Sequence, residues 1–289
     1  KDFTSPAIVV DNAKFVKMGT GKMSVSSVWT TTGTVSVNEG ELHVNSTKSL
    51  GTGALTVAQN ATFSGLSNMT YANAQKYPMT NSSITVSGTL QSGMTATSTS
   101  GAFLYFGGKK LTIKSTGTYR VGVEKSATAV SAPGCTHIFG DGAKAALVME
   151  DGATVDVFTA ESYNPVTSIG TDVQKYDSFC IFSGFATVNI GNVNFNLPAL
   201  PTGYYWDTTK FNTGYIYVRY SASSAIRGIQ FNEPVTVDII SANGSLVGTF
   251  NSTAGNAKAV FARKQLSRGV YVLRMRNAKG KTASIRMSK

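Results

Sequence analysis

One short sequence pattern recurs through the first 200 residues and constrains the fold more than any other feature. Each copy alternates apolar and polar residues, passes through a polar turn containing Gly or Ala, and then alternates again. Alternation with a period of two is typical of strands with one buried face. Thr, Val and Ile dominate these stretches, as strand positions prefer. The copies cover residues 35–44, 55–63, 84–90, 111–121, 147–157 and 188–195.

The spacing of the copies indicates the architecture. They begin 20, 29, 27, 36 and 41 residues apart, and repeats of this size are typical of a solenoid. A 20-residue step with two strands and no helix fits one coil of a right-handed parallel β-helix, whose coils stack about 4.8 Å apart. A β-sandwich is the alternative, but the spacing between its strands is normally shorter and more even. The longer steps imply insertions, which usually emerge on one side of a solenoid, at residues 66–83, 92–110, 124–144 and 158–187.

Residues 15–65 resemble a known family of bacterial surface repeats. The stretch begins with an apolar-Lys-x-Gly-x-Gly pattern, continues through a Thr-rich bridge, and closes on Leu-Gly-x-Gly-x-apolar-x-Val. It is similar to the autotransporter-associated β-strand repeat, and the resemblance implies an exposed β-helix with a structural role and no catalytic residues of its own. The matching positions are Lys17, Gly19, Gly21, Gly40, Leu42, Val44, Leu50, Gly51, Gly53, Leu55 and Val57.

The last 69 residues differ from the rest in charge and in pattern. Residues 1–220 hold 15 basic and 13 acidic residues, whereas residues 221–289 hold 11 and 2. Residues 235–250 alternate on both sides of Asn243-Gly244, which is the strongest short hairpin signal. Two domains are therefore predicted: a β-helix over residues 1–220 and a small Ig-like β-sandwich over residues 221–289. The basic excess favours either an acidic partner or a solvated face.

Three blocks of this tail, at residues 235–247, 266–273 and 280–289, resemble the C-terminal sorting domain of type IX (Por) secretion. The first turn has Gly244-Ser245 where the family often has Gly-Arg or Gly-Gln. The resemblance implies type IX secretion machinery as a partner, passage through the outer membrane, and then secretion or attachment to the cell surface. It also implies two possible steps after export: removal of the tail, and attachment of the passenger to surface lipopolysaccharide. The motif positions are Asn243, Gly244, Gly269, Tyr271, Gly280 and Lys281.

A β-helix can also belong to a polysaccharide lyase or a glycoside hydrolase, and both need acidic residues in one place. The candidates are Asp141, Glu150, Asp151 and Asp156. Three of them lie in turns, where acids are common for structural reasons, and Asp156 alternates outward on a strand. No nucleophile elbow, phosphate-binding loop or zinc motif occurs. The sequence therefore favours a non-enzymatic protein, with the carbohydrate-active enzyme as the alternative.

Tyr204, Tyr205 and Trp206 follow a proline-containing segment near the end of the predicted β-helix. Aromatic rings can stack on sugars, so these three are candidates for glycan contact. The alternative, which we favour, is that they cap the open end of the β-helix and shield its core from water.

The remaining features narrow the function classes. No motif for a metal, a cofactor or nucleic acid occurs, and Cys135 and Cys180 fit either a disulfide bond or two buried thiols. Residues 1–11 lack the layout of a signal peptide, so an exported protein would have lost its signal, or the chain is a C-terminal fragment of a larger surface protein. The predicted function is a secreted or surface-attached passenger with an adhesive, glycan-binding or structural role.

Overall fold

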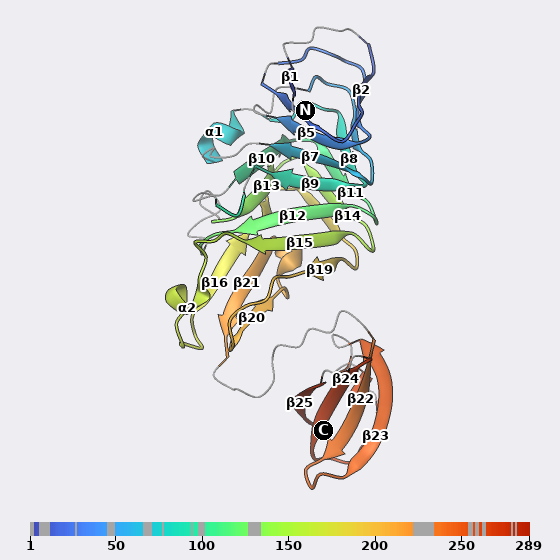
Figure 1. The fold of residues 1–289 in the computed structure, drawn as a ribbon, viewed down its shortest axis with the longest axis vertical. Coiled ribbons are helices and arrows are strands. Elements are labelled where there is room, and N and C mark those ends of the chain that lie inside the picture. Colours follow the sequence, from blue (N-terminus) through green and yellow to red (C-terminus); the bar gives the residue numbers. More distant parts are fainter. Residues whose placement is uncertain are drawn as a thin grey trace. The chain divides into compact units, whose positions relative to one another are not determined.

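The structure is a computed structural model, shown in Figure 1. It describes residues 3–5, 12–26, 28–44, 50–65, 71–76, 78–93, 95–97, 102–126, 134–221, 234–253, 257, 260–261, 264–278, 280 and 282–289. Contacts within the chain divide it into two compact units. The first unit comprises residues 1–169, 176–199 and 206–218, and the second comprises residues 170–175, 200–205 and 219–289.

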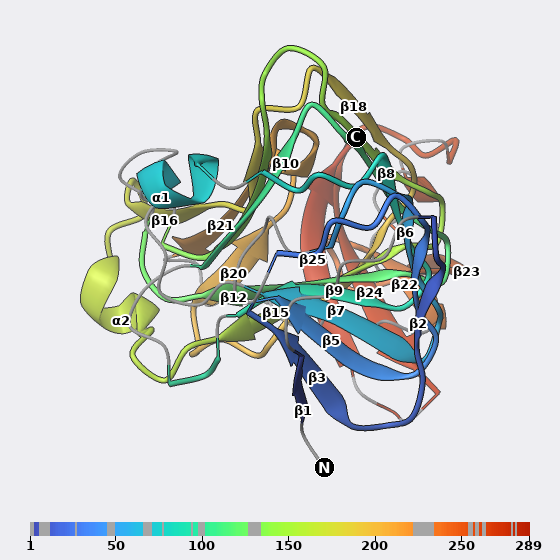
Figure 2. The ribbon, with the colours of Figure 1, turned by 90° about the horizontal axis from the view of Figure 1, so that it is seen from above.

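The first unit is built from two long sheets whose neighbouring strands are all parallel, as expected for a solenoid. One sheet follows the order β1 (Phe3–Ser5), β3 (Lys22–Val25), β5 (Gly40–Val44), β7 (Ala61–Gly65), β9 (Thr89–Ser92), β12 (Thr118–Val123), β15 (Thr154–Thr159), β19 (Asn194–Asn196). The other runs from β18 (Thr187–Ile190) through β14 (Ala146–Met149), β11 (Lys110–Ile113), β8 (Ser83–Val86), β6 (Leu55–Val57) and β4 (Val35–Val37) to β2 (Phe15–Lys17). Seen from above, the strands of the first sheet stack over one another (Figure 2).

The predicted insertions supply a third side and two short helices, α1 (Tyr71–Gln75) and α2 (Pro165–Ser168). A parallel sheet joins β10 (Ala102–Gly107), β13 (Thr136–Gly140) and β17 (Phe182–Ser183), and another has the order β16 (Tyr176–Cys180), β21 (Tyr215–Tyr220), β20 (Tyr204–Asp207). In the described part of the first unit, the helices are α1, α2 and η1 (Phe211–Thr213), none of which the sequence pattern predicted. The prediction of an all-β chain with the parallel sheets of a solenoid is confirmed.

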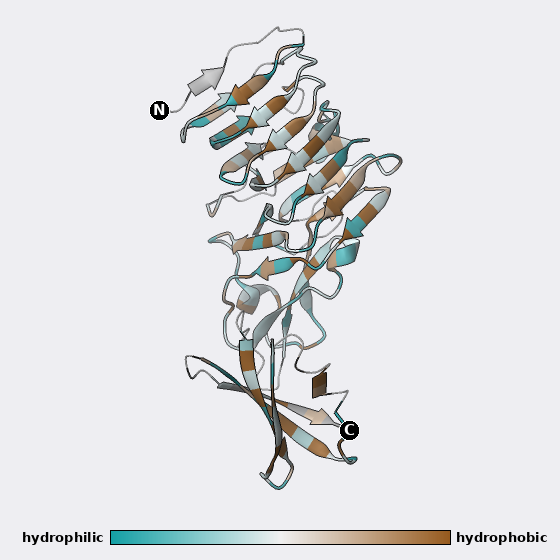
Figure 3. Cartoon of the chain, turned by 90° about the vertical axis from the view of Figure 1, so that its right-hand side faces the viewer, coloured by the Kyte–Doolittle hydropathy of each residue, from teal (hydrophilic) through white to brown (hydrophobic). Residues whose placement is uncertain are grey.

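The core follows from the alternation in sequence. In the second sheet, Val35 pairs in register with Leu55, and Leu111 pairs with both Ile84 and Leu147. All five side chains are completely buried. Aliphatic side chains are thus stacked coil upon coil, and each is removed from water by its own coil and its two neighbours. Figure 3 shows the resulting bands of hydrophobic residues along the strands.

The Lys-x-Gly-x-Gly pattern of the early coils has a structural explanation. The Lys17 ammonium is buried and donates hydrogen bonds to the carbonyl oxygens of Met18, Gly19 and Glu39 at 2.6–3.0 Å. Gly40 has φ +66°, and a Cβ atom there would lie 2.5 Å from the carbonyl oxygens of Gly19 and Gly21. The pattern therefore holds two successive turns together through a buried cation and a position open only to glycine.

The last coil is less covered than those before it. Val188 of β18 pairs with completely buried Leu147, yet it is 38% exposed. Phe195 of β19 is half-buried, although it pairs with completely buried Val155. These inward positions have a preceding coil on one side only, so part of the apolar interior meets solvent here.

In the second unit, a four-stranded antiparallel sheet has the order β23 (Leu246–Thr253), β22 (Pro234–Ser241), β24 (Val270–Asn277), β25 (Thr282–Ser288). One face buries Val237, Leu273 and Met275 against Phe261. The burial of β24 alternates along the strand, with Tyr271, Leu273 and Met275 buried. None of the described helices is long and apolar enough to cross a membrane.

Candidate functional site

Asp141 stabilises a turn. Its Oδ1 accepts hydrogen bonds from the backbone N–H groups of Ala143, Lys144 and Ala145 at 2.8–3.0 Å. These N–H groups, with that of Lys144 first, hold the pKa of the exposed carboxyl below its usual value. The Asp-Gly turn expected from the sequence therefore accounts for the residue.

Each of the other three candidate acids has a different partner. Glu150 pairs with Lys114 at 2.6 Å, which lowers the pKa of its carboxyl. Asp151 accepts the Asn192 backbone N–H at 2.7 Å, and Asp156 lies 3.4 Å from Arg120 and accepts from Asn196. All four acids thus make separate contacts within or between neighbouring coils. No group of three His, Cys, Asp or Glu side chains in the described ranges is placed to hold a metal ion.

The three predicted aromatic candidates lie on opposite faces of β20. Trp206 is buried, donates from Nε1 to the Pro198 carbonyl oxygen at 2.9 Å, and packs 6.1 Å from the Phe179 ring. Tyr204 is also buried, and its hydroxyl donates to the Gly170 carbonyl oxygen at 2.6 Å. Tyr205 is half-buried and alternates to the opposite face. Trp206 and Tyr204 are thus both buried, and their role as a cap stays a prediction.

The structure brings together three other tyrosines that the sequence reasoning did not select as a group. Tyr176 of β16 is 48% exposed, and its ring lies 5.5 Å from that of Tyr217 at 82°. Tyr215 and Tyr217 are two residues apart on β21, and their rings are stacked at 6.1 Å and 16°. We call these three side chains the tyrosine face. The alternation in residues 215–218 was a local signal for two of its members, whereas Tyr176 joins them only because β16 lies beside β21 in the sheet.

Packing behind the tyrosine face fixes its orientation. Ile216 and Val218, which alternate with the tyrosines, are completely buried. Asp177, next to Tyr176, is buried and accepts hydrogen bonds from the hydroxyls of Tyr163 and Ser168 at 3.0 and 2.5 Å. Burial first, and then the neighbouring Cys180, raise the pKa of Tyr215 to about 12, so its hydroxyl stays protonated at neutral pH.

A second aromatic cluster covers the outside of β10 and β13. Phe103 and His137 are paired in register, as are Tyr105 and Phe139, whose rings stack at 4.6 Å. Tyr71 of α1 lies 4.6 Å from the Phe139 ring. Burial lowers the pKa of His137 to about 4, so the neutral ring bonds to the Cys180 carbonyl oxygen and the Ser183 hydroxyl. This cluster is mostly buried under α1 and serves to attach the insertion.

The two cysteines are free and buried. The Cys135 thiol donates to the Cys180 carbonyl oxygen at 3.1 Å. Burial raises the pKa of Cys135 well above its usual value and that of Cys180 to about 11. Of the two alternatives left open by the sequence, the structure has the pair of buried thiols.

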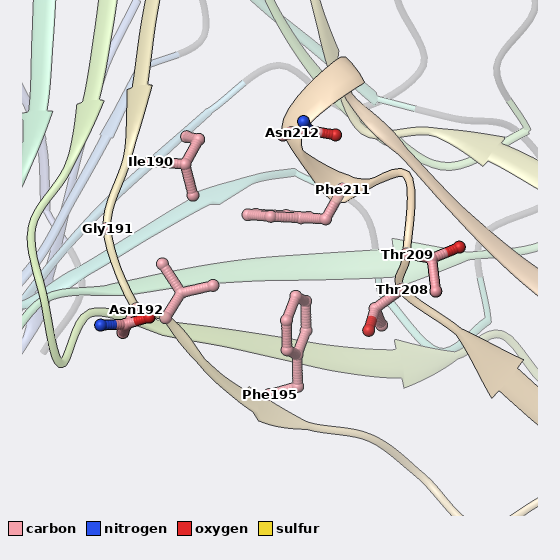
Figure 4. A pocket seen from close by; sticks show the side chains of 9 residues that line it. Ile190, Gly191, Asn192, Phe195, Thr208, Thr209, Phe211 and Asn212 are labelled. Atoms are coloured by element: carbon pink, nitrogen blue, oxygen red, sulfur yellow. The ribbon is translucent and has the colours of Figure 1, made fainter. Parts of the chain in front are cut away.

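An open hollow of about 350 Å³ lies at the last coil of the β-helix. Figure 4 shows the rings of Phe195 and Phe211 turned toward its middle; they meet edge to face at 4.9 Å and 87°. Asn192, Thr208, Thr209 and Asn212 surround these rings, and Ile190, Gly191 and Val193 complete the lining. All of the lining side chains are uncharged.

In the second unit, the predicted motif residues lie at turns and at one end of the sheet. The Asn243 side chain accepts from the Ser245 N–H and the Ser241 hydroxyl, while Gly244 and Gly280 have φ of +88° and +78°. Tyr271 donates to the Ser267 carbonyl oxygen at 2.8 Å, and Gly269 exchanges backbone hydrogen bonds with Lys289. Lys281 lies outside the described residues.

This geometry agrees with the comparison of the chain with protein families. Residues 222–287 match the family model of the secretion system C-terminal sorting domain. The tail is a type IX sorting domain. A chain carrying it is a secreted or cell-surface protein that interacts with the type IX secretion machinery.

The family comparison does not show the autotransporter-associated repeat at residues 15–65, so that resemblance stays a prediction. No curated protein and no solved structure matches the chain.

Proposed function

We propose that residues 1–220 form a non-enzymatic, glycan-binding passenger, which residues 221–289 direct to the cell surface as an Ig-like sorting domain. The tyrosine face is the observation that carries the proposal. It places three rings on the outside of the solenoid, where Tyr176 is 48% exposed and Tyr215 and Tyr217 are half-buried. Sugar rings present C–H groups on their faces and hydroxyls at their edges, and tyrosine matches both.

The rigidity of the tyrosine face supports this function. Tyr176, Tyr215 and Tyr217 lie on paired strands with buried residues between them, so little side-chain freedom is lost on binding. Tyrosine supplies a large contact area for only two rotatable angles. The glycan is expected to be neutral, because residues 1–220 have nearly balanced charge, with 15 basic and 13 acidic residues.

A binding screen tests the proposal. The full chain is passed over immobilised neutral and acidic polysaccharides, and both retention and newly released reducing ends are scored. We expect retention on a neutral polysaccharide without release of ends. Tyr176→Ala should weaken retention about tenfold, as truncation of an aromatic anchor typically does, whereas Tyr176→Phe should keep most of it because the ring remains.

Val166→Ala is the matched control, since Val166 is 51% exposed on α2 and its loss should leave retention unchanged. Retention that is equal in Tyr176→Ala and in the unaltered chain would remove the tyrosine face from the proposal. Release of reducing ends from any polysaccharide would contradict the non-enzymatic function and direct substitutions to the four candidate acids.

A further inference from the structure

The hollow at the last coil combines an apolar floor with a polar rim. The floor is formed by Phe195 of β19 and Phe211 of η1, with Ile190 at the end of β18. Phe211 is held from behind by Phe182, whose ring it meets edge to face at 5.6 Å. Phe195 is half-buried and stands at an inward position of a coil that no further coil covers. Phe211 is only 4% exposed, so solvent reaches this fixed apolar floor chiefly at half-buried Phe195 and Ile190.

The backbone on both sides of the hollow is firmly held. On one side, the Asn192 N–H donates to Asp151, and its carbonyl oxygen accepts from the Gly152 N–H at 2.9 Å. On the other side, the Asp207 carboxylate accepts from both the N–H and the hydroxyl of Thr209 at 3.0 and 2.6 Å. The rim residues thus stand on preorganised turns rather than on adaptable loops.

The rim offers hydrogen bonds that the protein does not use. Within the part of the chain that the structure describes, the side chains of Asn192, Thr208 and Asn212 make no hydrogen bond. Two amides and one hydroxyl supply both donors and acceptors. The two acids beside the rim, Asp151 and Asp207, are engaged by the turns described above.

From this arrangement we infer that the hollow is a binding site for one neutral sugar ring. Small-molecule sites are typically apolar, with a few placed polar groups, and measure roughly 300–1,000 Å³. The hollow of about 350 Å³ lies at the small end of that range. A pyranose has C–H groups on its faces that can contact the phenylalanine rings, and hydroxyls that can bond to the amides. It is uncharged, which suits a rim without charged side chains. The inference does not depend on the tyrosine face.

The test is a titration of the isotope-labelled full chain with methyl β-D-glucopyranoside and with N-acetylglucosamine, followed by amide NMR. The side-chain amide signals of Asn192 and Asn212 are assigned from their loss in Asn192→Ala and Asn212→Ala. We expect saturable shifts of both signals with at least one sugar. Phe195→Ala should weaken binding about tenfold, and Asn212→Ala, whose side chain is exposed and unpacked, should weaken it several-fold.

Val188→Ala is the control for loss of an exposed apolar side chain on the neighbouring strand, and it should leave the titration unchanged. Sugar binding that survives Tyr176→Ala but is lost in Asn212→Ala supports the hollow independently of the proposed glycan surface. Binding that is lost in Tyr176→Ala and unaffected by both Phe195→Ala and Asn212→Ala would overturn the inference, as would unmoved Asn192 and Asn212 signals at saturating sugar.

Discussion

The early coils and the later coils of the β-helix share one core but differ on the outside. Residues 35–65 contain two strands per coil and hold short polar side chains at outward positions, such as Ser36 and Thr56. From residue 102 onward the insertions add strands β10, β13 and β16, and the outward positions of this third side carry aromatic rings. The regular repeat builds length and stability, whereas the departures from it build surfaces that can bind.

The shared core is the first part of this comparison to test, and it has the largest expected effect. Leu55→Ala in an early coil and Leu111→Ala in a later one each remove a completely buried side chain. Each should lower the free energy of unfolding by about 2–5 kcal/mol, as measured by denaturant unfolding. A loss below about 1 kcal/mol in only one of them would mean that the two regions are not held by the same packing.

The third side should be weakened by acid. Its His137 has a pKa of about 4 when folded and about 6.5 when unfolded, so the unfolded chain binds the extra proton between these values. Stability should therefore be complete above about pH 6.5 and fall by roughly 3 kcal/mol toward pH 4. Unfolding free energies measured across this range check the slope.

His137→Gln is the matched variant for that measurement, because it cannot take up the proton. Its stability at pH 7 should be lower, but its decline between pH 6.5 and 4 should be shallower than that of the unaltered chain. Equal slopes in the two proteins would show that other groups cause the acid sensitivity.

A smaller effect separates two glycines of the early coils. Gly40 and Gly19 both have positive φ, but only at Gly40 would a Cβ atom meet backbone atoms, whereas at Gly19 nothing lies within 4 Å. Gly19→Ala should cost about 1 kcal/mol for the left-handed backbone alone, and Gly40→Ala should cost more. Thermal unfolding of both variants measures the difference, and equal losses would contradict close packing of successive turns.

The smallest expected change concerns the thiols of the third side. Burial and raised pKa should make Cys135 and Cys180 react slowly with iodoacetamide in the folded chain. Mass spectrometry should find them unmodified until denaturant is added. Rapid labelling under native conditions would mean that the third side opens more readily than its packing indicates.

Much of the architecture followed from the sequence, because strand alternation is a local property. Each strand of the two long sheets shows its buried face in a few residues, and the order of the recurring copies predicts which strands pair. The Asn243-Gly244 hairpin and the sorting tail are local signals of the same kind. The short helices were missed because five residues or fewer carry no detectable helical period.

The candidate sites depended on tertiary structure. Alternation along β21 predicts that Tyr215 and Tyr217 lie on the same face. Tyr176 joins them only because β16 pairs with β21, which is about 40 residues away in sequence. Phe195 and Phe211 belong to a strand and a turn with unrelated patterns, and only closure of the last coil brings their rings together. The sequence alone determined the strands, the stacked core and the export tail, since each depends on neighbours in the chain or on a fixed repeat. The tertiary structure decided which side chains meet on the outside, because the insertions that carry them follow no period.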